Sequence, residues 1–318
     1  MLMKMVHRAS ALVLTCVVAL ETPSFGWGSI GHMAVAYVAY KQLTPATKKK
    51  VNALLKLNPD YRNWEKKIPK DADATNRAMM TFMIAATWPD QIKNEAGYTD
   101  DGSENGNRPD GATSSQNIGY SDHLRHKYWH FINTPFTQDD STLGAMPTPN
   151  AETQITTFRA VLNSTESDEL KSYDLVWLLH LVGDVHQPLH AATRVSRADP
   201  NGDNGGNNVM LCAKPCKNEL HAFWDDLPGT GSNPNTAVTY AKKLLKPDPA
   251  LASDVNVSTW IKESFDDAQE YVYIAPIGTG DGPFMLTSAY RSTARKVAKD
   301  RVALAGVRLA ALLNNELK

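Results

Sequence analysis

The chain has 318 residues, of which 42% are hydrophobic and 21% charged, and its formal net charge at pH 7 is -1. This composition is typical of a folded globular protein and excludes a disordered or collagen-like chain. The near-zero charge also excludes a broadly basic surface, so positive charge for a nucleic-acid partner must be local or come from a metal.

The start of the chain has the pattern of a secretory signal peptide. Two basic residues precede the apolar stretch "ASALVLTCVVAL", which is too short to anchor the chain across a bilayer. Ser24 and Gly26 are small residues placed for a cut before Trp27. A buried N-terminal helix and a lipoprotein cut at Cys16 are the alternatives. We expect a signal peptide at 1-26, a mature domain at 27-318, and a secreted or periplasmic protein without a membrane anchor.

Helical periodicity dominates the mature chain. Long polar loops are expected at 94–120 and 196–208, with a short strand at 209–211. No run of alternating strands could make a large sheet. The sequence therefore predicts an all-α fold, a single mainly helical domain with long loops and at most a short β-hairpin. The expected helices span 30–43, 45–57, 71–88, 151–164, 168–187, 219–227, 235–246, 258–272 and 286–315.

Two cysteines remain after removal of the signal. Cys212 and Cys216 form a pair in an exported protein, which favours a disulfide closing a small loop. The alternative is a metal pair, but the spacing is not the usual two-residue gap and no further cysteine could complete such a site.

The stretch "LLHLVGDVHQPLH" combines an apolar background with several polar side chains. His180 and Asp184 are four residues apart, so they share one face of a helix, and His190 follows beyond a proline. His221 and Asp225 repeat the same spacing in "HAFWD". Imidazole with carboxylate is a ligand set suited to zinc.

One such pair on a helix is usually a surface hydrogen bond or a cap. Two pairs and an additional histidine, all in apolar surroundings, favour a metal site because unpartnered buried polar groups are costly. The mature N-terminus adds donors, since the free amine and the carbonyl of Trp27 can chelate a metal and His32 lies five residues on.

Several short motifs follow one another in a fixed order. After "WGSIGH" come "WPD", "WHFIN", "HLVGDVHQPLH", "GGN", "LHAFWD" and the tail "VRLAALLNNEL". Together they resemble the zinc-dependent single-strand-specific nucleases, the type I nucleases of the zinc phospholipase C/nuclease superfamily. The resemblance covers nearly the whole mature chain and implies the mainly helical fold of the phospholipase C/nuclease type.

The resemblance implies three zinc ions per chain. Asp184 would bridge two of them. The first ion would be held by Asp90, His130, His180 and Asp184, the second by His190, His221 and Asp225, and the third by the amine and carbonyl of Trp27, His32 and Asp184.

The resemblance also implies roles in catalysis. Asp90 would orient or deprotonate the attacking water, and Lys93 would assist the phosphate or Asp90. The alternative for Lys93 is a solvated lysine at a loop edge. Phe131 would stack on a base, which favours single strands because a duplex hides the base faces. Asn133 and Asn207 would contact the base, although some relatives have aspartate at position 133. The alternatives are an ordinary core aromatic for Phe131 and a simple turn for "GGN".

Three further histidines have no ligand role in this interpretation. His186 lies between ligand positions and is expected to orient a neighbour or to be structural. His123 and His126 lie in a polar context and are expected at the surface.

The sequence therefore predicts a monomeric zinc phosphodiesterase acting on RNA, single-stranded DNA and 3′-nucleotides, with 5′-phosphate products. A phospholipase C on phosphocholine lipids is one alternative, against which stand "WHFIN", "GGN" and Asp225, where the phospholipases have glutamate. A zinc-storing protein without turnover is the other.

Overall fold

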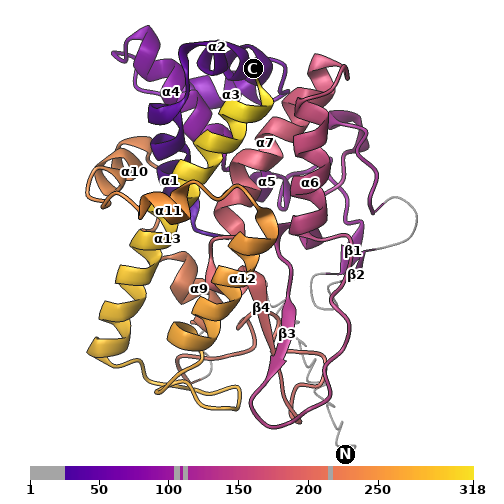
Figure 1. Cartoon of the computed structure of the whole chain (residues 1–318), viewed down its shortest axis with the longest axis vertical. Coiled ribbons are helices and arrows are strands. Elements are labelled where there is room, and N and C mark those ends of the chain that lie inside the picture. The colour runs from indigo at the N-terminus through magenta and orange to yellow at the C-terminus, as the bar shows by residue number, and fades with distance from the viewer. Residues whose placement is uncertain (1–25, 104–107, 110–113, 214–217) are drawn as a thin grey trace, which may run out of the picture.

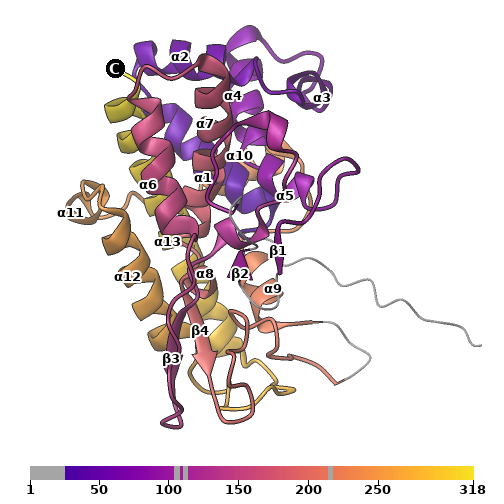
Figure 2. The same ribbon diagram turned by 90° about the vertical axis from the view of Figure 1, so that its right-hand side faces the viewer.

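The computed structural model describes residues 26–103, 108–109, 114–213 and 218–318. Within these residues the fold is mainly helical, as predicted, and adds two sheets of two short strands each. Figures 1 and 2 show an elongated molecule with α2 and the C-terminus at one end and the β3–β4 pair at the other.

The first five helices lie toward the end of the molecule that carries α2, and α1 and α5 carry His32 and Asp90 (Figure 1). Thr44 and Asp73 accept backbone N–H groups as N-caps of α2 and α4. The predicted helix at 71–88 corresponds to α4. A further short helix, α5, begins at Trp88 and was not predicted; Pro89 lies in its first turn, where its missing N–H removes no helical hydrogen bond. The short helix α3 was not predicted. The bounds are α1 Ser29–Gln42, α2 Pro45–Leu55, α3 Tyr61–Lys66, α4 Ala74–Ala85 and α5 Trp88–Ile92.

Helix α7, Asp168–Asp184, is the central helix of the fold. Ser167 caps its first turn, which also carries two acidic residues that suit the positive end of the helix dipole. Its last thirteen residues are all buried, as expected for a helix packed on every side. It contacts α6 (Ala151–Leu162), α2, α1 and α5, and its C-terminal end carries His180 and Asp184.

Of the remaining helices, α8 and α9 carry His190, His221 and Asp225. The 29-residue α13 packs along α1 and α7, as Figure 1 shows for its yellow ribbon. The predicted helix at 258–272 is α12 followed by a π-helical turn at Ala268–Val272. The bounds are α8 Pro188–Ala191, α9 Leu220–Asp225, α10 Pro234–Ala241, α11 Pro249–Ala252, α12 Val257–Asp267 and α13 Ser288–Glu316.

The strands are short. β1 (Gly102–Ser103) and β2 (Arg108–Pro109) pair antiparallel, whereas β3 (Thr134–Thr137) and β4 (Ala192–Val195) pair in parallel with Thr134 opposite Ala192. The sequence did not predict a parallel pair. At 209–211 the predicted strand reduces to one bridge between Met210 and Glu219. The β3–β4 pair joins the segments that follow His130 and His190.

Two groups of buried apolar side chains make up the interior. The larger includes residues of α1, α4, α6, α7 and α13, and the smaller includes Leu189, Trp224 and Tyr273. All seven tryptophans are fully buried. The predicted ligands lie where the two groups meet, because α7 belongs to the larger and α8 and α9 adjoin the smaller. None of the helices in the described part of the chain has the length and apolar character to cross a membrane.

Candidate metal centre

Eight predicted ligand side chains converge in one buried cluster, here called the ligand cluster. They come from α1, α5, α7, α8, α9 and a 3₁₀ turn at Lys127–His130. Potential ligand atoms form three groups in which they lie within 4.8 Å of one another. The first group is His32, His180 and Asp184, the second is Asp90, His130 and His180, and the third is His190, His221 and Asp225.

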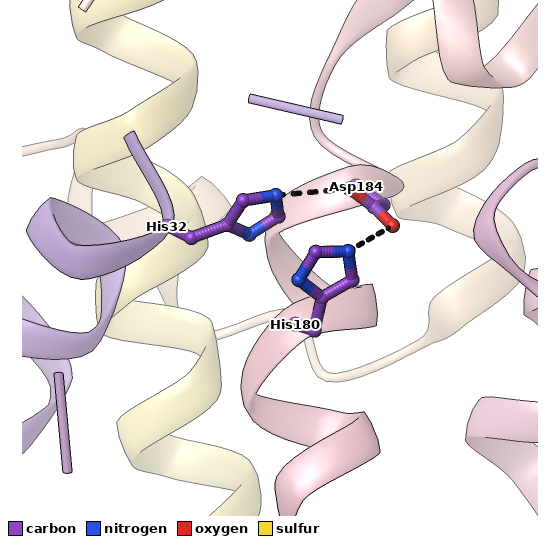
Figure 3. A group of neighbouring side chains, drawn as sticks. All are labelled: His32, His180 and Asp184. Atoms are coloured by element: carbon purple, nitrogen blue, oxygen red, sulfur yellow. Dashed lines mark ion pairs between the residues drawn. The ribbon is translucent and has the colours of Figure 1, made fainter. Parts of the chain in front are cut away.

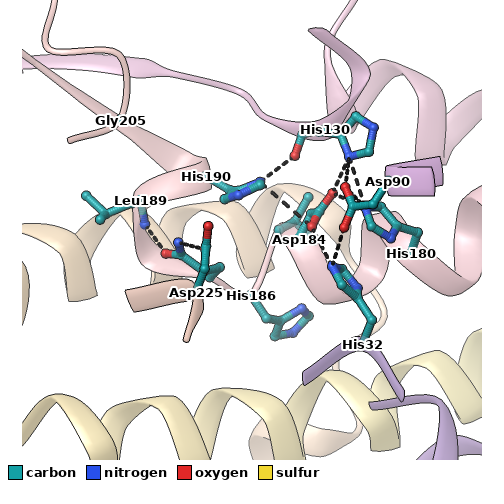
Figure 4. Close-up of polar contacts among 12 residues, drawn as sticks. His32, Asp90, His130, His180, Asp184, His186, Leu189, His190, Gly205 and Asp225 are labelled. Atoms are coloured by element: carbon teal, nitrogen blue, oxygen red, sulfur yellow. Dashed lines mark hydrogen bonds and ion pairs between the residues drawn. The ribbon is translucent and has the colours of Figure 1, made fainter. Parts of the chain in front are cut away.

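Asp184 lies at the centre of the ligand cluster. Its Oδ1 is 3.3 Å from His32 Nε2, and its Oδ2 is 3.1 Å from both His130 Nδ1 and His180 Nε2 (Figures 3 and 4). The two oxygens of one carboxylate therefore face different histidines. This geometry suits a carboxylate that bridges two ions.

Backbone carbonyls orient three of the histidines. His180 Nδ1 donates to the Ala86 carbonyl at 2.8 Å, and His190 Nδ1 donates to the His130 carbonyl at 2.7 Å. His221 Nδ1 donates to the Gly205 carbonyl at 2.6 Å. Because a carbonyl only accepts, each Nδ1 carries the proton when the ring is neutral, and each Nε2 presents a lone pair to the ligand cluster.

Two glycines allow the close approaches that the ligand cluster requires. A Cβ at Gly183 would lie 2.9 Å from His32 Nδ1, so a larger residue would displace that ring. Gly205 has φ of 61° and a Cβ there would lie 2.6 Å from the Leu189 carbonyl oxygen. The carbonyl that orients His221 thus depends on glycine at 205.

The residues fit a metal ion. Apart from the 3.3 Å contact between them, His32 Nε2 and Asp184 Oδ1 are buried and make no hydrogen bond, and buried polar atoms that lack a hydrogen bond cost free energy. His180 Nε2 also faces His130 Nδ1 at 2.9 Å. A cation among these atoms would satisfy them all, and imidazole nitrogens with carboxylate oxygens are the donors that zinc and similar ions prefer.

Burial keeps most of these histidines neutral, which is the metal-binding form. It lowers the pKa of His32 and His190, and it lowers the pKa of both His130 and His221 to about 3. For His180 burial also lowers the pKa, but Asp184 and Asp90 outweigh it and the net shift is upward.

The pKa values of the three aspartates in the ligand cluster are shifted in different directions. Burial would raise the pKa of Asp90, but Lys93 and His180 outweigh it and hold the pKa at about 2. Burial likewise opposes ionisation of Asp184, yet the neighbouring histidines keep its pKa well below the usual range. For Asp225 burial dominates and raises the pKa well above its usual range.

Lys93 faces the ligand cluster. It is 4% exposed, and its Nζ lies 3.0 Å from Asp90 Oδ1, so the alternative of a solvated lysine is wrong. Its charge also contributes to the lowered pKa of His130, His190 and His221. A buried cation therefore lies within reach of both ends of the ligand cluster.

The backbone at Gly26 and Trp27 passes beside the same groups. A Cβ at Gly26 would lie 1.7 Å from Asp184 Oδ1 and 3.0 Å from His32 Nε2. Trp27 is fully buried, and Gly28 N–H donates to the Asp225 carbonyl at 2.9 Å. The peptide bond that signal removal would cut thus lies next to two of the predicted ligands, His32 and Asp184.

Comparison with known proteins decides the family. The S1/P1 nuclease family matches residues 27–318. The chain belongs to the S1/P1 nuclease family. It is 24% identical to Nuclease S1 of Aspergillus oryzae, covering 93% of both chains. It is 25% identical to Endonuclease 3 of Arabidopsis thaliana, covering 96% of this chain and 92% of the relative, and 23% identical to Endonuclease 2 of the same plant, covering 95% of both.

As a member of the S1/P1 nuclease family, the protein is a hydrolase that cleaves nucleic acids. The family is metal-dependent, in agreement with the three groups of histidine and aspartate described above.

The residues predicted to contact substrate in this S1/P1 nuclease lie around α8 and β4. Phe131 is partly buried and packs on the larger core. Asn133 is buried with φ of 54°, and its Nδ2 has no hydrogen-bond partner. Asn207 is half-buried, and its Nδ2 donates to the Asn204 carbonyl at 2.7 Å. Asn207 Nδ2 is therefore engaged by its own turn.

The remaining histidines of the S1/P1 nuclease occupy different environments. His123 is exposed, as expected, but His126 is fully buried, so its surface prediction was wrong. His186 is also buried. Its Nδ1 donates to the Val182 carbonyl at 2.7 Å, and Arg308 Nη1 lies 3.0 Å from its Nε2, away from the ligand cluster (Figure 4). His186 thereby joins α13 to the end of α7.

Sequence reasoning missed Gln187, which hydrogen-bonds to Asp225. The available signal was an amide side chain directly before a proline, which is a common helix start. The predicted disulfide between Cys212 and Cys216 stays a prediction, because Cys216 lies outside the described residues.

Proposed function

We propose that the protein is a secreted, monomeric, zinc-dependent endonuclease that hydrolyses RNA and single-stranded DNA to 5′-phosphate products. It also removes the 3′-phosphate of nucleotides. The observation that supports this most strongly is the convergence of three groups of histidine and aspartate on one buried cluster centred on Asp184.

The ligand cluster would hold three zinc ions. Asp184 would contribute to two of the ligand sets, because its Oδ1 faces His32 and its Oδ2 faces His130 and His180. Asp90, His130, His180 and Asp184 would hold the first ion, His190, His221 and Asp225 would hold the second, and His32, Asp184 and the Trp27 terminus would hold the third.

Signal removal completes the third set. In the uncleaved chain the nitrogen of Trp27 is an amide, which is a poor ligand. Cleavage after Gly26 makes it an amine, next to Asp184 and His32. Activity therefore depends on export.

Bound zinc would lower the pKa of a water molecule and neutralise phosphate oxygens. Asp90 is ionised at neutral pH and holds its carboxylate 3.0 Å from Lys93 Nζ. Asp90 accepts a hydrogen bond from the attacking water and orients it toward phosphorus. Lys93 donates to a phosphate oxygen, stabilising the charge that builds up there.

Phe131 provides the preference for single strands. Its partly exposed ring stacks on an unpaired base, a contact that every base can make and that a duplex prevents. Asn133 and Asn207 supply polar contacts to the base edge. Asp225, where phospholipases have glutamate, and the family membership both favour a nuclease over a phospholipase C or a zinc store.

The test is a hydrolysis assay on RNA, single-stranded DNA, duplex DNA and a phosphocholine ester, with and without a chelator. We expect chelator-sensitive cleavage of RNA and single-stranded DNA, slow cleavage of the duplex, and no hydrolysis of the ester. Preferential hydrolysis of the ester would favour the phospholipase, and metal binding without turnover would favour the zinc store.

The role of Asp90 has a matched test. Asp90→Asn should lower turnover by at least about 100-fold because an amide cannot orient and deprotonate water as a carboxylate does. Asp266→Asn, the same change at an exposed site, should leave turnover unaltered. Wild-type activity in folded Asp90→Asn would show that Asp90 does not have this role.

A further inference from the structure

Gln187 lies at the junction of α7 and α8, and both ends of its side chain are engaged. It is fully buried. Its Oε1 accepts the Leu189 N–H at 2.5 Å, and its Nε2 donates to Asp225 Oδ1 at 2.7 Å. The Gln187 amide therefore bridges the start of one helix and the end of α9.

The orientation of this amide is fixed by its partners. A backbone N–H can only donate, so Oε1 must face Leu189, and Nε2 must then face the Asp225 carboxylate. In the opposite orientation the Gln187 NH₂ group would face the Leu189 N–H, and two donors cannot form a hydrogen bond. Gln187 thus presents an obligatory donor to Asp225.

These two hydrogen bonds act on His190 and Asp225, two members of the third group of potential metal ligands. Gln187 is the N-cap of α8, a helix of four residues with Pro188 at its start, and His190 is its third residue. The other hydrogen bond holds Asp225 Oδ1, while Oδ2 lies 3.4 Å from His221 Nε2. One side chain therefore sets the position of both His190 and Asp225 (the labelled His190, Leu189 and Asp225 are in Figure 4).

We propose that Gln187 is a positioning residue whose N–H donor aligns the Asp225 carboxylate for metal binding by His190, His221 and Asp225. The proposal rests on the proposed function, because it presumes an ion in this group. Outer partners that orient a ligand typically change metal affinity by about 10–100-fold, and we expect an effect of this size for one ion of the three.

Gln187→Glu removes the hydrogen-bond donor to Asp225 but keeps the acceptor that caps α8. Glutamate has nearly the same size and can still accept the Leu189 N–H, but it places a second carboxylate oxygen against Asp225 Oδ1. Gln187→Met removes the donor without adding charge, so it serves if the glutamate variant does not fold.

Asn233→Asp is the matched control. Asn233 is the exposed N-cap of α10, its side chain accepts the Asn235 N–H at 2.9 Å, and Pro234 follows it. The change from amide to carboxylate before a proline is therefore the same, but no ligand of the cluster accepts a hydrogen bond from Asn233 in the described part of the chain.

The measurement uses the mature chain, with zinc content determined by mass spectrometry and affinity by titration against a competing chelator. Cobalt substitution adds a visible spectrum that reports on ligand geometry. We expect three zinc ions in the wild type and in Asn233→Asp. Both Gln187 variants should bind one ion about 10–100-fold more weakly, with an altered cobalt spectrum and unchanged binding of the other two.

The outcomes separate the two proposals. A wild-type chain without zinc would refute the proposed function itself. Three zinc ions of unchanged affinity in a folded Gln187 variant would refute the positioning role alone. Equal weakening of all three ions would also refute it, since Gln187 would then act on the fold in general.

Discussion

In the part of the chain that the structure describes, two buried clusters of histidine and aspartate have different chemistry. The ligand cluster is one. The other is the His126 cluster, made of Asp101, Asp122, His126 and Tyr128. His126 Nδ1 lies 2.5 Å from Asp101 Oδ2, and its Nε2 lies 3.1 Å from Asp122 Oδ2. Tyr128 OH donates to Asp101 at 2.5 Å, and the His126 ring stacks on Trp129.

The difference lies in what each ring nitrogen faces. In the His126 cluster both nitrogens face carboxylates, so both must donate and the ring is a cation. Burial lowers the pKa of His126, but the hydrogen bonds of Asp101 and Asp122 outweigh it and raise the pKa above 6.5. In the ligand cluster, backbone carbonyls accept the Nδ1 protons of His180, His190 and His221, so the Nε2 lone pairs of these three rings face the cluster.

The same residue types therefore neutralise charge in two ways. In the His126 cluster the histidine ring itself is the cation. In the ligand cluster Lys93 pairs with Asp90, and the remaining histidine and carboxylate groups fit a metal ion from solution. Proximity of histidine and aspartate does not by itself indicate a metal site. The hydrogen-bond partner of the second ring nitrogen distinguishes the two cases.

The largest effect is expected from Asp184→Asn. Asp184 faces two groups at once, so its loss should lower nuclease activity by more than the roughly 100-fold typical of an outer partner, and should lower zinc content. Activity and zinc content of the purified variant are the measurements. Retention of three zinc ions would contradict a bridging role.

The next largest effect is expected from removal of metal, which should destabilise the ligand cluster but not the His126 cluster. An ion at 100 times its Kd stabilises the native state by about 2.7 kcal/mol, so chelation should lower the Tm substantially. The His126 cluster needs no ion, so His126→Gln should show the same metal-dependent shift of Tm as the wild type. A shift that disappears in this variant would link the two clusters.

His126→Gln should destabilise the fold by about 3 kcal/mol, because it leaves Asp101 and Asp122 buried without their cation. Denaturant unfolding of the apo-protein measures the loss. A difference below about 0.5 kcal/mol would mean that the imidazolium contributes little.

This loss should depend on pH. A folded-state pKa above 6.5 means that the contribution of His126 is fully present below 6.5 and is lost as the pH rises through the folded-state pKa. The stability gap between wild type and His126→Gln should therefore be widest in mild acid and narrow in alkali. A gap that widens with pH would contradict an imidazolium.

The smallest effect concerns Asp174, a buried carboxylate of α7 outside both clusters. Asn117 donates to its Oδ2 at 2.9 Å, its Oδ1 has no hydrogen-bond partner, and burial raises its pKa to about 8. The stability that the protonated carboxyl contributes is fully present at pH 4 and is lost as the pH rises to about 8, so Asp174→Asn should become more stable than wild type, by about 1 kcal/mol or more, between pH 4 and pH 9. Unfolding at the two pH values tests this.

Some of the site could be predicted because its residues lie close together in the sequence. His180 with Asp184, and His221 with Asp225, follow from helical spacing in apolar segments. Asp90 and His130 have no such local pattern, and their assignment came from the family resemblance. Their ligand roles stay predictions, although the structure places their side chains in the ligand cluster.

The errors concern contacts between distant segments. The burial of His126 depends on Asp101, which is 25 residues earlier, and on a polar stretch that reads as solvent-exposed. The parallel pairing of β3 with β4 joins strands 58 positions apart, and neither four-residue strand has a pattern that specifies its partner. The helical class was predictable because amphipathic periodicity is local, whereas such pairings are not.

The position of Trp27 has a practical consequence for producing the enzyme. Its indole is buried, and whatever precedes it in the chain must pass beside Asp184. If Trp27 is the mature start, a purification tag or leftover initiator methionine ahead of it would therefore lie against Asp184 and His32. A tag after Lys318 would instead extend from an exposed residue at the far end of the molecule.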